Sequence, residues 1–365
     1  MSNRLVNSLL LAFYVLANSA QLVAQSVTVK SVENRGLLFT DNQAGVDGTD
    51  AGYSLPIGSK TLWMFGDVFL TSPTTPHKDF LGSLSNCGLI VSRGSGTSPL
   101  KSYLFLSDPK TKLARPLLPN DPTDGANVRY WPFGSWYDSA HNLAYLFYGR
   151  ILTTGSGAFA FRSVGNGLAV ADTSRPDNIE FKKIPSNSDN IWWKSDPDAT
   201  IYGSAVVTGN TDGYIYVVGQ REGRGGKRAR LARVKPTGIA DKSAYQYLGA
   251  RATWSSRELD AVDIEGIENF PSELSISYNR YVGGYLASFS VGISDNIRLY
   301  VSDNPWGPYR KIAEISAPHR ILGKGFCYAG KEHPELNQES GKIVYITYVD
   351  SERYWLRMLK VTFQK

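Results

Sequence analysis

Five copies of one strand pattern, spread along the chain, constrain the fold more than any other feature of the sequence. Their strongest strands are short apolar and aromatic runs, each entered through a turn rich in Gly, Asn, Asp or Lys: TLWMFGDVF from Thr61, NLAYLFYGR from Asn142, GYIYVVGQR from Gly213, GGYLASFS from Gly283 and GKIVYITYV from Gly341. Such a run after such a turn is typical of a strand that follows a hairpin. Each copy also has a strand rich in small or polar residues before it and another apolar strand after it. We therefore predict five sheets.

An outer strand follows in four of the copies, starting at Ser102, Ile179, Tyr245 and Tyr309, whereas the fifth copy ends with Lys365. One strand-like segment near the N-terminus, Ser26 to Val32, remains unassigned. Repeats of roughly 60 to 80 residues with about four strands each indicate blades around a channel rather than a sandwich. We predict an all-β, five-bladed β-propeller whose last blade is completed by the N-terminal strand, paired beside Trp355 to Phe363.

Residues 26–365 are expected to form this propeller as a single domain. The 35 Gly and 18 Pro residues supply many turns, and no linker or charge run divides the chain. No long segment has apolar residues at the 3.6-residue spacing of a helix, so helices should be scarce.

Residues 1–25 have the pattern of a secretory signal peptide. Arg4 precedes an apolar run from Leu9 to Ala17, and small residues follow, with cleavage expected near Ser19 or Ala24. The run is too short to span a bilayer, although a buried N-terminal strand or a membrane anchor is the alternative. We expect a secreted protein, extracellular or periplasmic, without stable membrane insertion.

Cys87 and Cys327 are the only cysteines of the chain. They fall in the first and fifth predicted blades, which become neighbours when the ring closes. An exported chain permits a disulfide between them. The alternative is that each is a separate buried, small apolar residue.

Three carboxylates are the candidate catalytic residues. Asp50 opens the first channel-lining strand, Asp67 ends the next strand, and Glu273 begins an apolar inner strand. Paired carboxylates in a concave site lined by aromatic residues match glycoside hydrolysis. Asp50, in GTDAG, is the expected base or nucleophile, because backbone amides would favour its ionised form. Glu273 is the expected acid, because apolar surroundings raise the pKa of a carboxyl group. Asp67 would orient the substrate or tune a neighbour.

Each of these carboxylates also has a structural explanation. Asp50 and Asp67 could satisfy backbone amides in turns, and Glu273 could be an exposed edge charge. Five further residues are predicted to bind substrate from the same face of the ring: Asn86, Arg150, Arg221, His333 and Glu335. His333 and Glu335 are two apart, so on a strand they point the same way, and they could equally form a structural pair.

Cofactor chemistry has no support in the sequence. Metal-binding spacings such as HxH or HExxH are absent, so we predict no metal and no cofactor, and the absence of GxxxxGK[ST] disfavours phosphate chemistry. Seven cations crowd one hairpin of the third blade: Arg221, Arg224, Lys227, Arg228, Arg230, Arg233 and Lys235. They could be a solvated surface or could steer an acidic or hydroxyl-rich polymer. Nucleic acid is not an expected partner, since the chain has no nucleic-acid-binding module.

The motifs GTDAGYS, LWMFGDVF, SNCGLIVS, PSELSISYN and, near the end, YAGKEHPELNQESGKIVYITY occur in this order. Together they resemble a family of secreted five-bladed propellers long described only as a domain of unknown function, some of whose members are endo-D-arabinanases. The SDNPWGPY stretch is similar to an outer-strand motif of arabinanase and xylosidase propellers. The resemblance implies a carbohydrate-active propeller with acidic residues at the channel mouth, and it carries over Asp50, Asp67 and Glu335 as motif positions.

The expected function is therefore a secreted glycoside hydrolase acting on a polysaccharide or oligosaccharide, possibly an arabinofuranoside or D-arabinan. A non-catalytic glycan-binding or surface-interaction propeller is the main alternative, because a fold does not fix a function. A polysaccharide lyase or phosphorylase is a third. The oligomeric state stays open.

Overall fold

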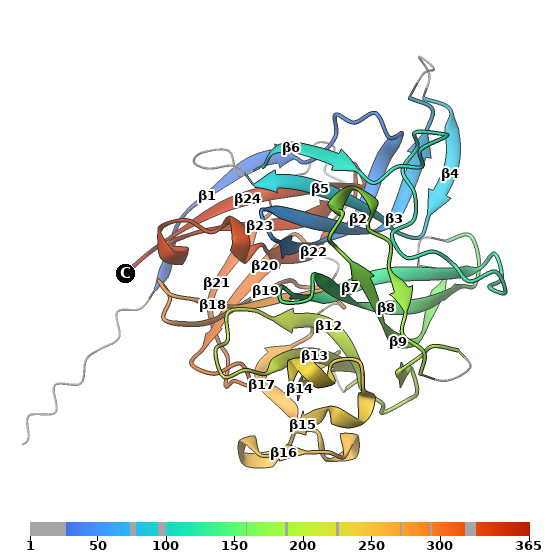
Figure 1. Ribbon diagram of the computed structural model, residues 1–365. Coiled ribbons are helices and arrows are strands. Elements are labelled where there is room, and N and C mark those ends of the chain that lie inside the picture. The colour runs from blue at the N-terminus through green and yellow to red at the C-terminus, as the bar shows by residue number, and fades with distance from the viewer. Residues whose placement is uncertain are drawn as a thin grey trace, which may run out of the picture.

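Five antiparallel sheets surround a common centre in the computed structural model (Figure 1). The structure describes residues 27–73, 78–93, 100–157, 159–186, 189–223, 226–270, 272–292, 294–317 and 326–365. The expected signal peptide therefore lies outside the described residues. Within them, every helix is a single three-residue 3-10 turn: η1 (Pro176–Asn178), η2 (Pro236–Gly238), η3 (Lys242–Ala244), η4 (Ala250–Ala252), η5 (Glu258–Asp260), η6 (Pro334–Leu336) and η7 (Glu339–Gly341). None of these turns is long or apolar enough to cross a membrane.

The strands of each blade follow one another from the channel outward. The first blade contains β2 (Val46–Ile57), β3 (Lys60–Thr71), β5 (Cys87–Arg93) and β6 (Leu100–Phe105), with β4 (Phe80–Leu84) beside β3. The second contains β7 (Val128–Asp138), β8 (Leu143–Thr153), β9 (Phe161–Asp172) and β10 (Lys182–Lys183), with β11 (Trp193–Lys194) beside β9. The third contains β12 (Ile201–Val207), β13 (Ile215–Arg221), β14 (Arg228–Val234), β15 (Gln246–Leu248) and β16 (Trp254–Ser255), with β17 (Asp263–Glu268) beside β14.

The fourth blade contains β18 (Ser275–Asn279), β19 (Gly284–Ser290), β20 (Asn296–Ser302) and β21 (Arg310–Ser316). The fifth contains β22 (Cys327–Glu332), β23 (Ile343–Asp350), β24 (Trp355–Gln364) and, as its outer strand, β1 (Thr28–Leu37). Val29 pairs with Phe363 and Val32 with Val361, so the predicted closure by the N-terminal strand is confirmed. Figure 1 shows β1 and β24 side by side.

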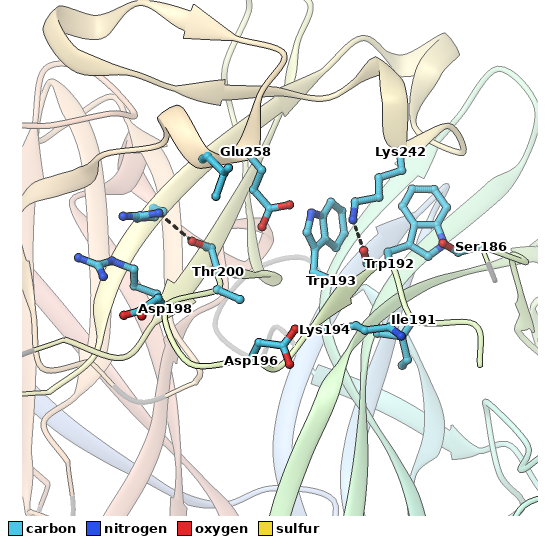
Figure 2. Close-up of a pocket in the computed structure, with 14 residues that line it drawn as sticks. Ser186, Ile191, Trp192, Trp193, Lys194, Asp196, Asp198, Thr200, Lys242 and Glu258 are labelled. Atoms are coloured by element: carbon cyan, nitrogen blue, oxygen red, sulfur yellow. Dashed lines mark hydrogen bonds between the residues drawn. The ribbon is translucent and has the colours of Figure 1, made fainter. Parts of the chain in front are cut away.

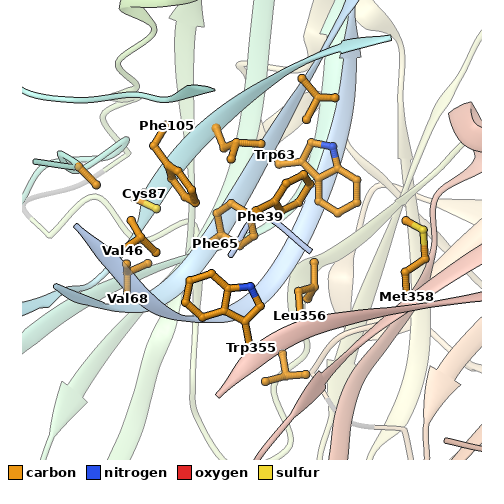
Figure 3. Packing of buried hydrophobic residues seen from close by; sticks show 14 of the residues in the cluster. Phe39, Val46, Trp63, Phe65, Val68, Cys87, Phe105, Trp355, Leu356 and Met358 are labelled. Atoms are coloured by element: carbon orange, nitrogen blue, oxygen red, sulfur yellow. The ribbon is translucent and has the colours of Figure 1, made fainter. Parts of the chain in front are cut away.

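Hydrophobic packing also shows that the ring is closed. The buried apolar residues form five clusters, and each cluster joins two neighbouring blades. An open row of five blades would have only four such interfaces. The cluster between the first and fifth blades packs Trp63 and Phe65 of β3 against Trp355 and Leu356 of β24 (Figure 3). Blade-to-blade burial, not helix packing, therefore stabilises the fold.

The inner strands are irregular at the level of the candidate site. Pairing slips in β2 near Ala51, in β7 between Pro132 and Ser135, in β12 after Tyr202, and in β22 before Lys331. Each slip coincides with a glycine in the sequence: Gly52, Gly134, Gly203 and Gly330, in the order of the strands. Such bulges redirect side chains and often border functional sites.

Several local expectations are wrong. The outer strand predicted from Ile179 is reduced to β10, because the chain there turns through η1 and returns toward β11. The third blade carries β16 and β17 in addition to the predicted strands. Cys87 and Cys327 are both unpaired and buried. They lie in different hydrophobic clusters, which agrees with the alternative of two separate apolar residues.

Candidate active site

Asp50 lies on the bulged part of β2, at the end of the channel where the inner strands begin. Ala51 has a φ of 64° and Gly52 a φ of 84°. A Cβ atom on Gly52 would lie 2.7 Å from Leu356 of β24. Glycine is therefore required there by both conformation and space. The bulge turns Asp50 so that its carboxylate accepts the Ala51 N–H at 2.6 Å.

Groups from the fifth blade surround this carboxylate. The Tyr354 hydroxyl, in the turn between β23 and β24, donates to Asp50 Oδ2 at 3.3 Å. The backbone N–H of Thr49 donates to the Tyr354 carbonyl at 2.8 Å. Burial raises the pKa of Asp50, and the Ala51 amide, the Tyr328 and Tyr354 hydroxyls and the Lys331 charge only partly oppose it. The expectation that backbone amides keep Asp50 strongly acidic is thus wrong, because one amide does not outweigh burial.

Glu273 and Asp67 belong to the same electrostatic cluster. Burial raises the pKa of Glu273 to about 7, with the Asp50 charge adding to the rise and Lys331 opposing it. Burial and the Asp50 charge raise the pKa of Asp67 to about 6, against the opposing effects of Arg129 and Trp131. The Oδ1 atom of Asp67 is buried without a hydrogen-bond partner. Asp50 thus interacts electrostatically with each of the other two predicted carboxylates.

Glu273 does not lie on the inner strand itself. It precedes β18, which begins at Ser275. The apolar setting expected from the strand pattern instead comes from burial in the mouth of the channel.

Lys331 is the main residue of this cluster that the sequence analysis missed. It lies on β22 and is only 2% exposed. Its ammonium donates to the carbonyls of Ala329 and Ala51, at 2.8 and 3.3 Å, and lies 4.4 Å from the centre of the Tyr53 ring. Burial lowers its pKa to about 8, while the charges of Glu273 and Asp50 oppose that fall. The glycine-associated bulge before Lys331 was the available sequence signal.

His333 and Glu335 do not complete the rim of the mouth. β22 ends at Glu332, and Pro334 starts η6, so the strand alternation assumed for the two residues does not apply. Both line a cavity of about 120 Å³ inside the channel. The His333 ring nitrogens are 2.6 Å from the hydroxyls of Ser54 and Thr347. The ring also stacks on Trp63 at 4.3 Å.

These contacts give His333 a structural role. Burial lowers the pKa of His333 well below its ordinary value, so the ring is neutral. Its neighbour Glu332 is 3% exposed and accepts hydrogen bonds from Ser277 at 2.6 Å and Asn337 at 2.8 Å. Burial raises the pKa of Glu332 to about 7.

The other predicted substrate ligands lie elsewhere. The Asn86 side chain is buried, with Nδ2 donating to the carbonyls of Leu118 and Tyr130 and Oδ1 accepting the amides of Leu117 and Leu118. These bonds tie the first blade to the second and give Asn86 a structural role.

Arg150 and Arg221 are each held by a neighbouring carboxylate. Arg150 pairs with Asp124 at 3.0 Å. Arg221 pairs with Asp263 at 3.3 Å and lines a separate cavity in the third blade. Neither residue therefore belongs to the cluster around Asp50.

Four cations of the basic hairpin are held by contacts within the third blade. Arg230 shares Asp263 with Arg221, at 2.9 Å. Arg233 and Lys235 lie over the Tyr214 ring at 4.1 and 3.6 Å. Arg224 lies outside the described residues. Lys227, which the structure does describe, is linked to the mouth, because its charge lowers the pKa of Glu273.

The donor set is that of an acid–base site. Among the described residues, no group of three or more His, Cys, Asp or Glu side chains is arranged to hold a metal ion. Three carboxyls with raised pKa values, two of which interact with the buried Lys331 ammonium, can exchange protons near neutral pH.

The fold and this site define a five-bladed β-propeller with an acidic centre at the channel mouth. The chain belongs to the family described as a domain of unknown function, DUF4185, whose profile matches residues 36–360. The resemblance seen in the sequence motifs is thus confirmed. A comparison with curated proteins gave no match.

Solved structures share the fold at low identity. One is Zg3597, a family 117 glycoside hydrolase from Zobellia galactanivorans, with a TM-score of 0.50, 10% identity, and coverage of 91% of this chain and 90% of that chain. A GH43_1 enzyme from Xanthomonas citri has a TM-score of 0.48 and 13% identity, covering 87% and 88%. The α-L-arabinofuranosidase PaAbf62A from Podospora anserina has a TM-score of 0.45 and 10% identity, with coverage of 89% of this chain and 93% of that chain. At these identities the likeness shows the fold alone.

Proposed function

We propose that this chain is a glycoside hydrolase whose active site is the carboxylate cluster at the channel mouth. One observation carries the proposal: Asp50, Asp67 and Glu273 come from two strands of the first blade and the entrance to the fourth, yet the charge of Asp50 raises the pKa of both other carboxyls. Partly buried carboxyls held together in this way are costly unless they serve chemistry or one another.

The environments of the carboxyls suggest their roles. Glu273, with a pKa of about 7, is protonated in a useful fraction of molecules at neutral pH and acts as the general acid. Asp50 receives the most hydrogen bonds of the three, from the Ala51 amide and the Tyr328 and Tyr354 hydroxyls, so it acts as the base or nucleophile. Asp67 orients the substrate or tunes the neighbouring Asp50, whose charge acts on it.

Aromatic side chains next to the cluster suit a sugar ring. Phe69, two residues after Asp67, stacks on Tyr354 at 4.6 Å and contacts the exposed Phe80 at 6.2 Å. Stacked aromatic faces pack against the C–H faces of sugars. We propose a polysaccharide or oligosaccharide substrate, with D-arabinan and other arabinofuranosides tested first because of the family resemblance and the arabinofuranosidase among the structures of similar fold.

The test is release of new reducing ends from a polysaccharide panel. Asp50→Asn and Glu273→Gln should each lower turnover on the order of a hundredfold or more. Asp138→Asn, at the far end of β7 and bonded to His141 and the Ala140 amide, is the matched control and should keep full activity. Binding without new reducing ends would favour a non-catalytic glycan-binding propeller, and full turnover in both amide variants would refute the assignment of Asp50 and Glu273 as catalytic residues.

Two further measurements separate the roles. Azide should restore turnover of the Asp50 variant by acting as an external nucleophile, whereas the Glu273 variant should recover on substrates with acidic leaving groups. The reverse pattern would exchange the two assignments.

Export is part of the same proposal. Residues 1–25 would act as a signal peptide and direct the enzyme to the periplasm or the medium. N-terminal sequencing of the protein purified from its native compartment should find a start near Ser19 or Ala24, and an intact Met1 would contradict export by cleavage.

A further inference from the structure

The third blade contains a cavity of about 660 Å³ that is separate from the channel mouth (Figure 2). Its lining includes none of the three carboxyls proposed for catalysis. The cavity exists because this blade has an insertion between β15 and β17, in which η5 folds back over the loop that carries β11. Glu258 and Leu259 of η5 form one wall, and the segment from Trp192 to Thr200 forms another.

The walls carry positive and negative side chains in nearly equal number. Four cations (Lys194, Arg221, Arg230 and Lys242) and three carboxylates (Asp196, Asp198 and Glu258) line the cavity. The Arg230 guanidinium donates to the buried Thr200 hydroxyl at 3.2 Å, and Lys242 donates to the Trp192 carbonyl. Figure 2 shows Glu258 and Asp196 approaching the open space from different segments.

This balance selects the kind of ligand. Asp263, just outside the lining, already pairs with Arg221 and Arg230, so an anionic polymer would meet uncompensated carboxylates rather than free cations. Burial raises the pKa of Glu258, which the Lys242 and Arg230 charges oppose, and a cationic ligand would meet those cations. A neutral, hydroxyl-rich molecule can donate to the carboxylates and accept from the cations at once.

Apolar surface is present as well. Trp192 and Trp193 form a buried floor, at 3% and 1% exposure, and Leu259 projects from the rim at 88% exposure. A sugar combines hydroxyls with apolar C–H faces, which is the combination that these walls would cover.

The cavity opens on the same face of the ring as the catalytic cluster. Thr200 immediately precedes the inner strand β12 and Arg221 ends β13, as Asp50 and Asp67 lie near the corresponding ends of β2 and β3. The hairpin after Arg221 carries Lys227, whose charge reaches Glu273. One polysaccharide chain could therefore contact both places.

We propose that this third-blade cavity is a second saccharide-binding site, specific for neutral glycan chains, that holds a polymer at a distance from the point of cleavage. Its role in turnover rests on the proposed function, but its binding does not. The test variant is Asp196→Ala/Asp198→Ala, in an exposed loop. The control is Asp177→Ala/Asp303→Ala, two exposed aspartates at the opposite face.

Binding is measured on the catalytically silenced Asp50→Asn chain, with linear arabinan, xylan and dextran as neutral probes and polygalacturonate as the anionic one. The test variant should weaken binding to the preferred neutral probe roughly five- to thirty-fold, and the control should not. On the active chain, KM for that polymer should rise by a similar factor, with no change on an aryl glycoside too short to reach the cavity.

The outcomes separate the two proposals. Cavity-dependent binding by a chain that hydrolyses nothing would refute the proposed function and support the second site. Hydrolysis that is indifferent to the cavity substitutions would refute the second site and leave the proposed function standing. Tighter cavity-dependent binding of polygalacturonate than of any neutral probe, or no cavity-dependent binding at all, would also overturn the second site.

Discussion

Replacing Glu332 by Gln should stabilise the protein, and increasingly so as the pH rises. Glu332 lies in the channel with 3% exposure, and its two oxygens accept hydrogen bonds from Ser277 and Asn337. A glutamine keeps both contacts, since its oxygen can accept from Asn337 while its amide donates to the Ser277 hydroxyl. The substitution thus removes a buried charge without removing a hydrogen bond.

The magnitude follows from the pKa. Burial raises the pKa of Glu332 from its ordinary 4.5 to about 7. The folded state therefore holds the proton more tightly than the unfolded state, and this stabilising effect is complete below pH 4.5 and lost as the pH rises through 7. The loss amounts to about 3 kcal/mol. The entropy of unfolding is about 2.1 cal/mol/K per residue, so this loss of stability lowers the Tm of a domain of about 340 residues by roughly 5 °C.

Thermal unfolding of the two chains between pH 4 and 8 is the assay. The Tm advantage of Glu332→Gln over the parent should grow by about 5 °C between these limits. Glu339→Gln, which alters an exposed residue paired with Lys342, should show no such growth. A pH-independent difference, or a Glu332 variant that is less stable at pH 8, would refute the reasoning.

Three other substitutions or deletions test the remaining parts of the structure. Lys331→Met should move both limbs of the pH–rate profile to higher pH, because the lysine charge lowers the pKa of Asp50 and of Glu273; a profile that keeps its limbs would exclude this electrostatic role. Gly52→Ala should lower the free energy of unfolding by about 1–3 kcal/mol in chemical denaturation, since the φ of Gly52 is 84° and the new Cβ would lie 2.7 Å from Leu356. The control Gly58→Ala, with a φ of 55° and open space around the new Cβ, should lower it less. Equal losses of stability in the two variants would show that packing is not the cause. Deleting residues 28–34 should expose the edge of β24 and cause aggregation, visible in light scattering, and a monodisperse deletion variant with the parent Tm would contradict that role.

The ring and its closure followed from the sequence because they depend on repetition, which is visible without coordinates. The strand count showed one unassigned strand-like segment at the N-terminus and no outer strand in the last blade. The electrostatic interaction of Asp50 with Asp67 and with Glu273 is consistent with the same topology. Asp50 and Asp67 lie on an inner strand and its neighbour, and Glu273 immediately precedes another inner strand.

The chemistry of the site was less predictable because it depends on irregular backbone. Lys331 faces Asp50 only because β22 slips out of register between Tyr328 and Lys331, which breaks the two-residue alternation used for His333 and Glu335. Tyr354 reaches Asp50 from a hairpin turn more than 300 positions away in sequence. The cavity of the third blade arises from an insertion whose short strands and 3-10 turns have no periodic pattern.

Splitting the fifth blade between the two ends of the chain changes how the protein can lose structure. In a linear array of repeats, an end unit can unfold while its neighbours persist. Here Thr28 pairs with Gln364, so the loss of either end removes one strand from a sheet that packs on both the first and the fourth blades. The pairing of β1 with β24 joins residues that are farther apart in sequence than those of any other strand pair that the structure describes. It is also the pairing that completes the interfaces with the first and fourth blades. Folding should therefore be cooperative across the whole ring, with ring closure as a late step that waits for the last strand.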